Sequence, residues 1–294
     1  MNAFIAHLKK LDWILITSAL LLFGLGLLSI YSSSLGRGDF SNFQKQILFG
    51  ALGLFLMLAL SFFNWRILRD NPYLILTLYF IGLAALLGLL FFAPEIRGVQ
   101  KWYQLGPFSI DPAEFLKIVL IIIFAKYFST KHIEMYRIRH LLLSGVYVLL
   151  PALLLFFQPD LGSVIIMIGL WVGVLLISGI KLRHFLILML SFILIFAFSW
   201  NFLMQDYQKT RITAFLQPAD PLGAAWSQNQ AKVAIGSGGI LGKGFGSGSQ
   251  TQLGFLPEPQ TDFIFSAIAE EFGIIGVLVL LLLFSVLLWR IVKI

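Results

Sequence analysis

The chain has 294 residues, of which 59% are hydrophobic and only 12% are charged, and it carries a formal net charge of +7. Soluble domains are about 25% charged, so this composition excludes a soluble domain and predicts a polytopic membrane protein. The absence of cysteine excludes disulfide bonds and thiolate chemistry. The positive charge does not indicate a nucleic-acid partner, because membrane proteins collect Lys and Arg in their cytoplasmic loops.

Apolar stretches of about 20 residues are long enough to cross a membrane as helices. In chain order they predict seven spans, which are Trp13–Gly36, Gln46–Trp65, Asn71–Pro94, Leu141–Pro159, Leu161–Ile180, Phe185–Gln205 and Phe263–Trp289. The first stretch is too long for the core of a cleavable signal peptide. We therefore expect an all-α fold with a single membrane domain over residues 1–294.

An eighth span is less obvious, because the apolar run that follows Lys117 is only eight residues long. A helix from Pro112 to about Phe128 can cross if Glu114 and Lys117 lie within the membrane region. Asp111 suits the N-cap of such a helix, and proline suits its first turn. We expect this helix as the fourth of about eight spans.

Eight spans place both termini on the same side of the membrane. Twelve Lys and Arg residues then fall in the loops on that side, whereas the short loops on the other side hold four, which are Arg37, Lys45, Arg97 and Lys101. The positive-inside rule puts the richer side in the cytoplasm. We therefore expect both termini in the cytoplasm and any chemistry at the outer face.

Three outer segments are candidates for a functional site: the loop 93–113, the corner 158–160 and the long segment 206–261 between the last two spans. A loop as long as the last one is uncommon unless it is functional. Within it, Leu222–Ile235 could form a short interfacial helix, and 236–248 is dense in glycine.

Three carboxylates belong to the last apolar stretch: Asp262 at its beginning, and Glu270 and Glu271 inside it. Each would cost about 2.5–3.5 kcal/mol at the centre of a membrane helix, so such residues usually have a function. On a continuous helix Asp262 and Glu270 point about 80° apart, and Glu271 points about 180° from Asp262. We therefore expect no single cluster. Asp262, nearest the outer water, is the candidate general base, and the two glutamates are candidate structural supports.

Ionisable residues also occur near the fourth and sixth spans. Glu114 and Lys117 are three residues apart and share a helix face, which predicts a buried ion pair at an outward cavity or a pair that only satisfies itself. Asp160 suits either the cap of the sixth span or a functional site. Trp102, taken by position alone, is typical of the aromatic belt at a membrane interface.

The glycine-dense run 236–248 invites comparison with phosphate-binding loops. It lacks the spacing of a Walker A motif and faces outward, away from ATP, so a flexible re-entrant loop is the better interpretation. Backbone N–H groups of the run could still bind a lipid pyrophosphate.

Four motifs occur in order along the chain: Lys-Trp-Tyr-Gln-Leu-Gly-Pro-Phe-Ser-Ile-Asp-Pro-Ala-Glu-Phe-Leu-Lys (101–117), Gln-Pro-Asp-Leu-Gly (158–162), Gln-Asn-Gln-Ala-Lys-Val-Ala-Ile-Gly-Ser-Gly-Gly (228–239) and Leu-Pro-Glu-Pro-Gln-Thr-Asp-Phe-Ile-Phe with Glu-Glu-Phe-Gly (256–273). Together they resemble the SEDS family of bacterial shape, elongation, division and sporulation proteins, and most closely its RodA-type branch. The resemblance covers nearly the whole chain.

The resemblance implies a peptidoglycan glycosyltransferase of the cytoplasmic membrane. Such an enzyme polymerises lipid II on the outer face during cell elongation and works with a class B penicillin-binding protein. It also implies which positions are functional: the essential aspartate corresponds to Asp262, and the other matching positions are Trp102, Glu114, Lys117 and Asp160. Lys117 would offset charge near the leaving pyrophosphate or hold Glu114. Other outer cations that could serve are Arg97, Lys101, Lys209, Arg211 and Lys243, and a divalent cation remains open as a cofactor.

The chain departs from the family pattern at several places. Lys101 stands where Arg is usual, which keeps the charge but loses a bidentate fork. Asp111 stands where Gln is common, and Gln260 where His is common. Family members usually have ten spans, so we expect this chain to lack the last two.

Two rival functions remain open from sequence. A lipid II flippase would use the intramembrane carboxylates and Lys117 as a polar path. That path would have to continue through the inner half of the membrane, where the other spans carry no charge. A non-catalytic scaffold would hold a periplasmic synthase through Gly- and Leu-rich helix faces, and its function would survive Asp262→Asn.

Overall fold

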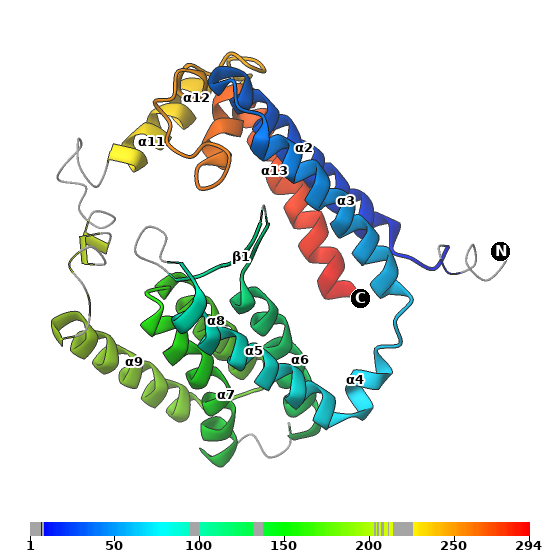
Figure 1. Cartoon of the computed structure of the whole chain (residues 1–294), viewed down its shortest axis with the longest axis vertical. Coiled ribbons are helices and arrows are strands. Elements are labelled where there is room, and N and C mark those ends of the chain that lie inside the picture. The colour runs from blue at the N-terminus through cyan, green and yellow to red at the C-terminus, as the bar shows by residue number, and fades with distance from the viewer. Residues whose placement is uncertain are drawn as a thin grey trace. The chain divides into compact units, whose positions relative to one another are not determined.

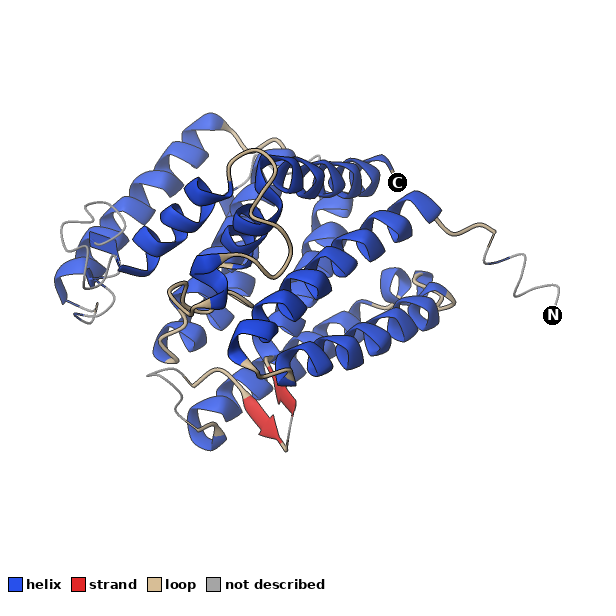
Figure 2. Cartoon of the chain, turned by 90° about the horizontal axis from the view of Figure 1, so that it is seen from above, coloured by secondary structure: helices blue, strands red, loops and turns tan. Residues whose placement is uncertain are grey.

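The computed structural model describes residues 7, 9–94, 100–106, 108–131, 138–202, 204, 206, 209–210, 212–213 and 226–294. Its long helices are α2 (Trp13–Arg37), α3 (Ser41–Ser61), α5 (Pro72–Phe92), α6 (Pro112–Lys131), α7 (Ile138–Phe157), α8 (Leu161–Ile177), α9 (Leu182–Phe202) and α13 (Ile264–Lys293). Shorter helices are α4 (Arg66–Asp70), α11 (Trp226–Gly238) and α12 (Ser249–Gln252). One hairpin, β1 (Tyr103–Leu105) with β2 (Phe108–Ile110), interrupts this helical fold (Figure 2).

A helix stands at each of the eight predicted spans. Within the described residues, six helices are long and apolar enough to cross a membrane: α2, α3, α5, α7, α9 and α13. Helix α8 is apolar but has only 17 residues. Helix α6 has 20 residues and carries Glu114 in its first turn, as expected for the fourth span. The chain is therefore a mostly helical, multi-pass membrane protein.

The predicted second span was placed too late in the chain. It was expected at Gln46–Trp65, but α3 begins at Ser41 and ends at Ser61. Lys45 therefore lies inside the helix rather than before it. A lysine near a helix end can extend its aliphatic stem along the apolar surface and keep its ammonium group in water, so a charge there does not mark the helix boundary.

The chain divides into two compact units. The first consists of residues 1–62 and 203–294 and contains α2, α3, α11, α12 and α13. In it α2, α3 and α13 run side by side (Figure 1). Asp12, the N-cap of α2, forms an ion pair with Arg290 in the last turn of α13 at 2.5 Å. Because Ser32 in the last turns of α2 binds Glu271 near the start of α13, the two helices are antiparallel.

The second unit consists of residues 63–202 and contains α4 to α9 and the hairpin. Its core is formed mainly by α5, α6, α7 and α8, with buried side chains that include Tyr79, Phe124, Leu155 and Met167. The buried Tyr79 hydroxyl donates to the Tyr147 carbonyl oxygen at 3.0 Å, which satisfies a polar group that would otherwise be costly among apolar side chains.

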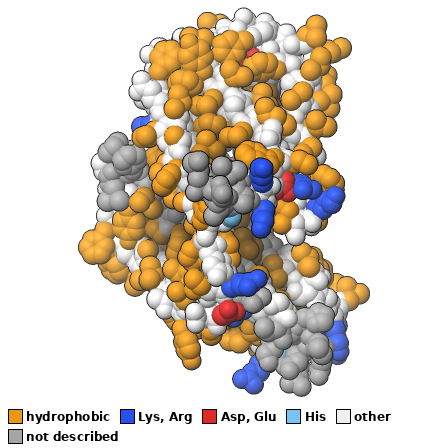
Figure 3. All heavy atoms as spheres, turned by 90° about the vertical axis from the view of Figure 1, so that its right-hand side faces the viewer, with side chains coloured by type: hydrophobic (Ala, Val, Ile, Leu, Met, Phe, Trp, Pro, Cys, Tyr) orange, Lys and Arg blue, Asp and Glu red, His pale blue; other side chains and the backbone are white. Residues whose placement is uncertain are grey.

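Outward-facing apolar side chains cover much of both units. Helices α3 and α9 contain no fully buried residue among those described, and Figure 3 shows many hydrophobic side chains on the face that it draws. Large apolar side chains exposed in this way would be unfavourable in water and are suited to contact with lipid.

Candidate active site

Asp262 lies in a turn immediately before α13, not in the helix. The expected helical angles between Asp262 and the two glutamates therefore do not apply, because the helix begins at Ile264. The Asp262 side chain is exposed, whereas Glu270 and Glu271 are 0% and 2% exposed. Among the described residues no ion pair or hydrogen bond is formed by the Asp262 carboxylate, so its oxygens are accessible from solvent.

The backbone around Asp262 is held in place on both sides. The backbone N–H groups of Thr261 and Phe263 both donate to the Glu258 carbonyl oxygen at 3.2 Å. Before the turn, Leu256 is fully buried in a small core with Ala231, Ala234 and Ala267, and after it Phe263 packs against the same core. The turn therefore presents an exposed carboxylate on a fixed backbone.

Glu270 is a buried acceptor for the segment that follows α11. Its two carboxylate oxygens accept from the Gln250 backbone N–H at 2.9 Å, and from the Thr251 N–H at 3.0 Å and hydroxyl at 2.8 Å. The Lys243 ammonium, which was expected at the substrate or as a support, pairs with Glu270 at 3.0 Å and donates to Ser249 at 2.8 Å. Charge-assisted bonds of this kind are about twice as strong as neutral ones, so Glu270 fixes α12 and the glycine-dense loop.

Glu271 joins α13 to α2. It accepts a hydrogen bond from the Ser32 hydroxyl and another from the Gln252 side chain at 3.3 Å. Gln252 also donates to the Ser32 carbonyl oxygen at 3.0 Å. The three carboxylates that appear close in sequence thus have separate surroundings: one faces water and two fix the protein around it.

The glycine-dense loop 239–248 supplies hydrogen-bond partners for backbone groups at a break in α13. Gly273 has φ 64° and ψ −162°, so α13 consists of two helical segments, whereas one continuous span was expected. The carbonyl oxygens freed at Glu270 and Glu271 accept from the N–H groups of Lys243 and Gly244, both at 3.0 Å. The N–H of Ile274 donates in turn to the Gly239 carbonyl oxygen at 3.0 Å. Irregular backbone at membrane depth is tolerated where protein satisfies it in this way.

These contacts argue against the phosphate-binding interpretation of the loop. The N–H groups of Gly242, Lys243, Gly244, Gly246 and Ser247 already donate within the protein. The predicted helix at Leu222–Ile235 is found as α11, Trp226–Gly238, and residues 222–225 lie outside the described ones.

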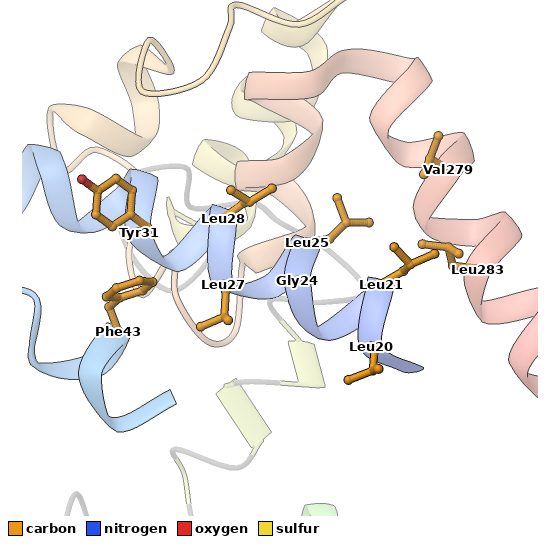
Figure 4. A pocket seen from close by; sticks show the side chains of 10 residues that line it. All are labelled: Leu20, Leu21, Gly24, Leu25, Leu27, Leu28, Tyr31, Phe43, Val279 and Leu283. Carbon is orange, nitrogen blue, oxygen red and sulfur yellow. The ribbon is translucent and has the colours of Figure 1, made fainter. Parts of the chain in front are cut away.

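One cavity of the first unit is apolar. It has a volume of about 580 Å³ and lies along α2, α3 and α13. Figure 4 shows Tyr31 and Phe43 at one end and Val279 and Leu283 at the other. Among its described lining residues only Tyr31 has a polar side-chain atom. A cavity lined in this way suits hydrocarbon.

In the second unit, the hairpin brings Lys101 and Asp111 together. Tyr103 pairs with Ile110 across the two antiparallel strands, so the residues that flank the strands meet at the open end. The Lys101 ammonium lies 3.3 Å from Asp111 and 3.0 Å from Asp160 at the corner between α7 and α8. One lysine therefore joins the hairpin to that corner.

Both aspartates of this triad also cap helices. Asp111 accepts from the Ala113 N–H at 2.8 Å at the start of α6, and Asp160 accepts from the Ser163 N–H at 3.3 Å at the start of α8. Both caps agree with expectation. Asp160 thus combines the cap and the ion-pair roles that the sequence left open.

Burial and charge give the three groups different pKa values. Burial opposes ionisation of Asp160, but hydrogen bonds from Ser163 and Lys101 and the lysine charge outweigh it and lower its pKa. Burial also opposes the Lys101 charge, but Asp160 and then Asp111 raise the pKa of Lys101. For Asp111 burial dominates over its Ala113 and Lys101 contacts, and its pKa is raised.

Glu114 and Lys117 form the expected pair, with 2.6 Å between Oε1 and Nζ. The pair is not buried as a whole, however: the Glu114 side chain is 61% exposed and that of Lys117 is 14% exposed. The expectation of a buried pair is therefore wrong for the carboxylate, which lies in the first turn of α6 and points outward. Trp102 follows Lys101 and immediately precedes β1 in the chain, and its side chain is half-buried.

Within the described residues, no three His, Asp or Glu side chains lie together in a way that could hold a metal ion. The expectation of a divalent cation stays a prediction. Arg97 and Arg211, which were also considered as outer cations, lie outside the described residues.

The chain matches known proteins over almost its whole length. The sequence profile of the FtsW, RodA and SpoVE group, described as "Cell cycle protein", matches residues 12–294. The chain belongs to this family. The family expected from the four motifs is thereby confirmed.

Two curated relatives illustrate the range of this FtsW/RodA/SpoVE family. Stage V sporulation protein E of Bacillus subtilis (strain 168) is 34% identical over 298 residues, which cover 96% of this chain and 78% of the relative. Peptidoglycan glycosyltransferase MrdB of Escherichia coli (strain K12) is 36% identical over 282 residues, which cover 94% of this chain and 73% of the relative.

Solved structures of this family share the fold. A chain of the structure described as structural coordination of polymerization and crosslinking by a peptidoglycan synthase complex has a TM-score of 0.77 and 29% identity, over 96% of this chain and 77% of that chain. The rod shape determining protein RodA of Thermus thermophilus has a TM-score of 0.64 and 26% identity, over 96% of this chain and 74% of that chain.

Several contacts around the candidate site were not predicted from the sequence. The link from Lys101 to Asp111 could have been found, because Gly106 between two short β-prone runs is a hairpin signal. The links from Ser32 to Glu271 and from Gln260 to Ser34 and Asn42 join residues more than two hundred positions apart. No local pattern indicates such pairs.

Proposed function

We propose that the chain is a peptidoglycan glycosyltransferase that polymerises lipid II at the outer face of the bacterial cytoplasmic membrane. The observation that carries the proposal is the exposed Asp262 carboxylate on a fixed turn at the start of α13. The names of curated relatives support the activity, since MrdB and several FtsW proteins are peptidoglycan glycosyltransferases or probable ones.

In the proposed reaction Asp262 is the general base. The 4-hydroxyl of one substrate's terminal sugar attacks C1 of the muramyl sugar of the other substrate. The new C1–O bond forms as the bond from C1 to the pyrophosphate oxygen breaks, and undecaprenyl pyrophosphate leaves with the electron pair. The Asp262 carboxylate accepts the hydroxyl proton. A base within hydrogen-bond reach contributes about 10²–10⁴-fold.

The charged residues of the second unit have supporting roles in this proposal. Lys101 holds the hairpin and Trp102 against the α7–α8 corner through Asp160. Lys117 holds Glu114 at the start of α6, so its ammonium is partly neutralised before any pyrophosphate binds. We propose that Trp102, Glu114, Lys117 and Asp160 contact or orient lipid II.

The proposed membrane orientation places both ends of the described chain in the cytoplasm. The ion pair between Asp12 and Arg290 supports it, because it puts the beginning of α2 and the end of α13 at the same end of the first unit. Asp262 lies at the opposite end of α13, which the proposal assigns to the outer face.

We propose a class B penicillin-binding protein as the partner, together with membrane lipids. The structural neighbour from a peptidoglycan synthase complex of polymerization and crosslinking supports such a partner. A role in cell elongation is favoured by the likeness to a rod shape determining protein. The test of that role is whether depletion makes cells lose rod shape, as elongation requires, or grow as filaments, as division requires.

The activity is tested with purified protein and the partner in liposomes that contain fluorescent lipid II. The proposal expects glycan polymer that grows with time and needs this chain. Movement of lipid II between leaflets without polymer would establish the flippase instead. Polymer that forms equally when this chain is omitted would leave it a scaffold.

A further inference from the structure

We infer that Gln260 is a positioning residue for Asp262, an inference that rests on the proposed function. The side chain of Gln260 hydrogen-bonds to residues of both α2 and α3, and so attaches the Asp262 turn to the corner between these helices, residues 34–42. The described hydrogen bonds of the turn itself are local, whereas this attachment is to a different part of the unit.

The attachment uses both ends of the Gln260 amide. Its Nε2 donates to the Ser34 hydroxyl oxygen at 3.2 Å, and its Oε1 accepts from the Asn42 side-chain nitrogen at 2.6 Å. A third bond runs from the Arg37 guanidinium to the Leu256 carbonyl oxygen at 3.4 Å. The corner therefore contacts the segment 256–260 at two places just before Asp262.

The chemistry of Ser34 determines which way the amide of Gln260 points. The Ser34 hydroxyl donates its one hydrogen to the Ile30 carbonyl oxygen at 2.8 Å, so toward Gln260 it can only accept. The glutamine NH₂ must face Ser34, and its oxygen must face Asn42. A glutamate at this position would set a carboxylate oxygen against the lone pairs of Ser34.

Without this attachment the turn would keep its internal shape, but its position relative to α2 and α3 would be less well fixed. The bonds from Thr261 and Phe263 to the Glu258 carbonyl oxygen keep its shape, and Phe263 still packs on the small core. The position of the turn over the α2–α3 corner would no longer be held by Gln260. A misplacement of about 1 Å can cost about 10²-fold in rate, so the chemical step should suffer before binding or folding does.

The test compares variants of the full chain in lipid II polymerisation, with kcat and KM determined from initial rates. Gln260→Met keeps the length of the side chain and removes both hydrogen bonds. We expect it to lower kcat about 10- to 100-fold while KM for lipid II and the thermal unfolding midpoint stay near wild type. Gln44→Met is the matched control, because Gln44 is exposed on α3 near Asn42 and takes no part in the attachment; its kcat should be unchanged.

Asn42→Ala is the second variant, and its exposed position makes misfolding no concern. It removes one of the two bonds and should lower kcat about 2- to 10-fold, the value of one hydrogen bond. Combined with Gln260→Met it should lower kcat no further, because both changes remove the same interaction.

The inference and the proposed function fail in different ways. If wild type makes no polymer, or Asp262→Asn makes as much as wild type, the proposed function is wrong. If Asp262→Asn is inactive while Asn42→Ala and a folded Gln260→Met both keep the kcat of wild type, only the positioning role is wrong. Two further results would also overturn it. One is a fall in kcat that is accompanied by a clear fall in the unfolding midpoint, and the other is a double variant in which the effects of the two substitutions on kcat multiply.

Discussion

At the scale of single residues, the carboxylates around the start of α13 differ by what surrounds them. Glu270 accepts from two backbone N–H groups and from the side chains of Thr251 and Lys243, and its charge is thereby compensated in a fully buried place. Asp262 is exposed to solvent instead. The buried Glu270 carboxylate is engaged by the protein and not accessible to a substrate, which is why Asp262 is the proposed base and Glu270 the proposed support.

This difference predicts a large effect of Glu270→Gln on stability. The glutamine keeps the shape, but it loses the charge that pairs with Lys243 and turns an NH₂ group toward backbone donors. Breaking a buried pair in this way costs about 3–5 kcal/mol, and the partial exposure of Lys243 places the expectation at the lower end. Thermal unfolding in detergent measures it, with Asp206→Asn, at an exposed carboxylate of the same unit, as the control. An unchanged midpoint for Glu270→Gln would contradict this role.

The contributions of Asp160 and Asp111, which share Lys101, to the stability of the fold should depend on pH in opposite directions. The pKa of Asp160 is lowered in the folded protein, so its stabilising effect is present above its unfolded pKa of about 3.9 and is lost as pH falls below it. The pKa of Asp111 is raised, so its favourable contribution is present below about pH 3.9 and is lost as pH rises through its folded pKa.

At pH 7 the opposite pKa shifts predict different unfolding midpoints for the Asp→Asn variants at these two positions. Asp160→Asn should lower the unfolding midpoint, because Lys101 loses the closer of its two partners and the cap loses its charge. Asp111→Asn should leave the midpoint unchanged or raise it, since the ionised form is disfavoured by burial. The midpoints of both variants against wild type, measured between pH 4 and pH 7, check the order. Equal losses at pH 7 would refute it.

At the scale of elements, the glycine-dense loop and the broken helix α13 depend on each other. Gly242 has φ 82°, a conformation that L side chains rarely adopt. A Cβ there would also collide with the Glu271 carbonyl oxygen. The backbone must therefore approach α13 without a side chain at this place, and the loop bonds that repair the break need that approach.

Gly242→Ala should consequently destabilise the first unit and reduce activity together. Strain in the left-handed region costs about 1–3 kcal/mol, and the collision adds to it. Gly236→Ala in α11 is the control, because a Cβ there meets no atom. Limited proteolysis of the segment 226–255 would report the change. If the two variants resist cleavage equally, the loop is not held as described.

The helices could be predicted from sequence because membrane spans depend on long apolar runs, which are local. Asp111 and Asp160 were likewise recognised as caps from their neighbours in sequence. The break at Gly273 could not be predicted, since it is stable only when a loop thirty residues earlier supplies hydrogen bonds. The start of α3 was missed because Lys45 resembles a boundary. For the site, Asp262 came from its motif, whereas Gln260 depends on partners from the other end of the chain.

At the scale of the whole molecule, the orientation in the membrane has a direct test. The chain has no cysteine, so one introduced thiol is a unique probe. Asp39→Cys, in the turn between α2 and α3, should react with a membrane-impermeant maleimide in intact spheroplasts, while Lys293→Cys at the end of α13 should react only after permeabilisation. The opposite pattern would reverse the proposed topology and place Asp262 in the cytoplasm.

The central claim is that Asp262 accepts the proton when lipid II is polymerised. The most direct measurement is the polymerisation rate of Asp262→Asn in the presence of the partner protein, with Asp70→Asn, at an exposed carboxylate at the end of α4, as the control. The account predicts that Asp262→Asn loses about 10²-fold or more in rate at unchanged folding and partner binding, and that Asp70→Asn keeps the rate of wild type. Polymer formed by Asp262→Asn at the rate of wild type would contradict it.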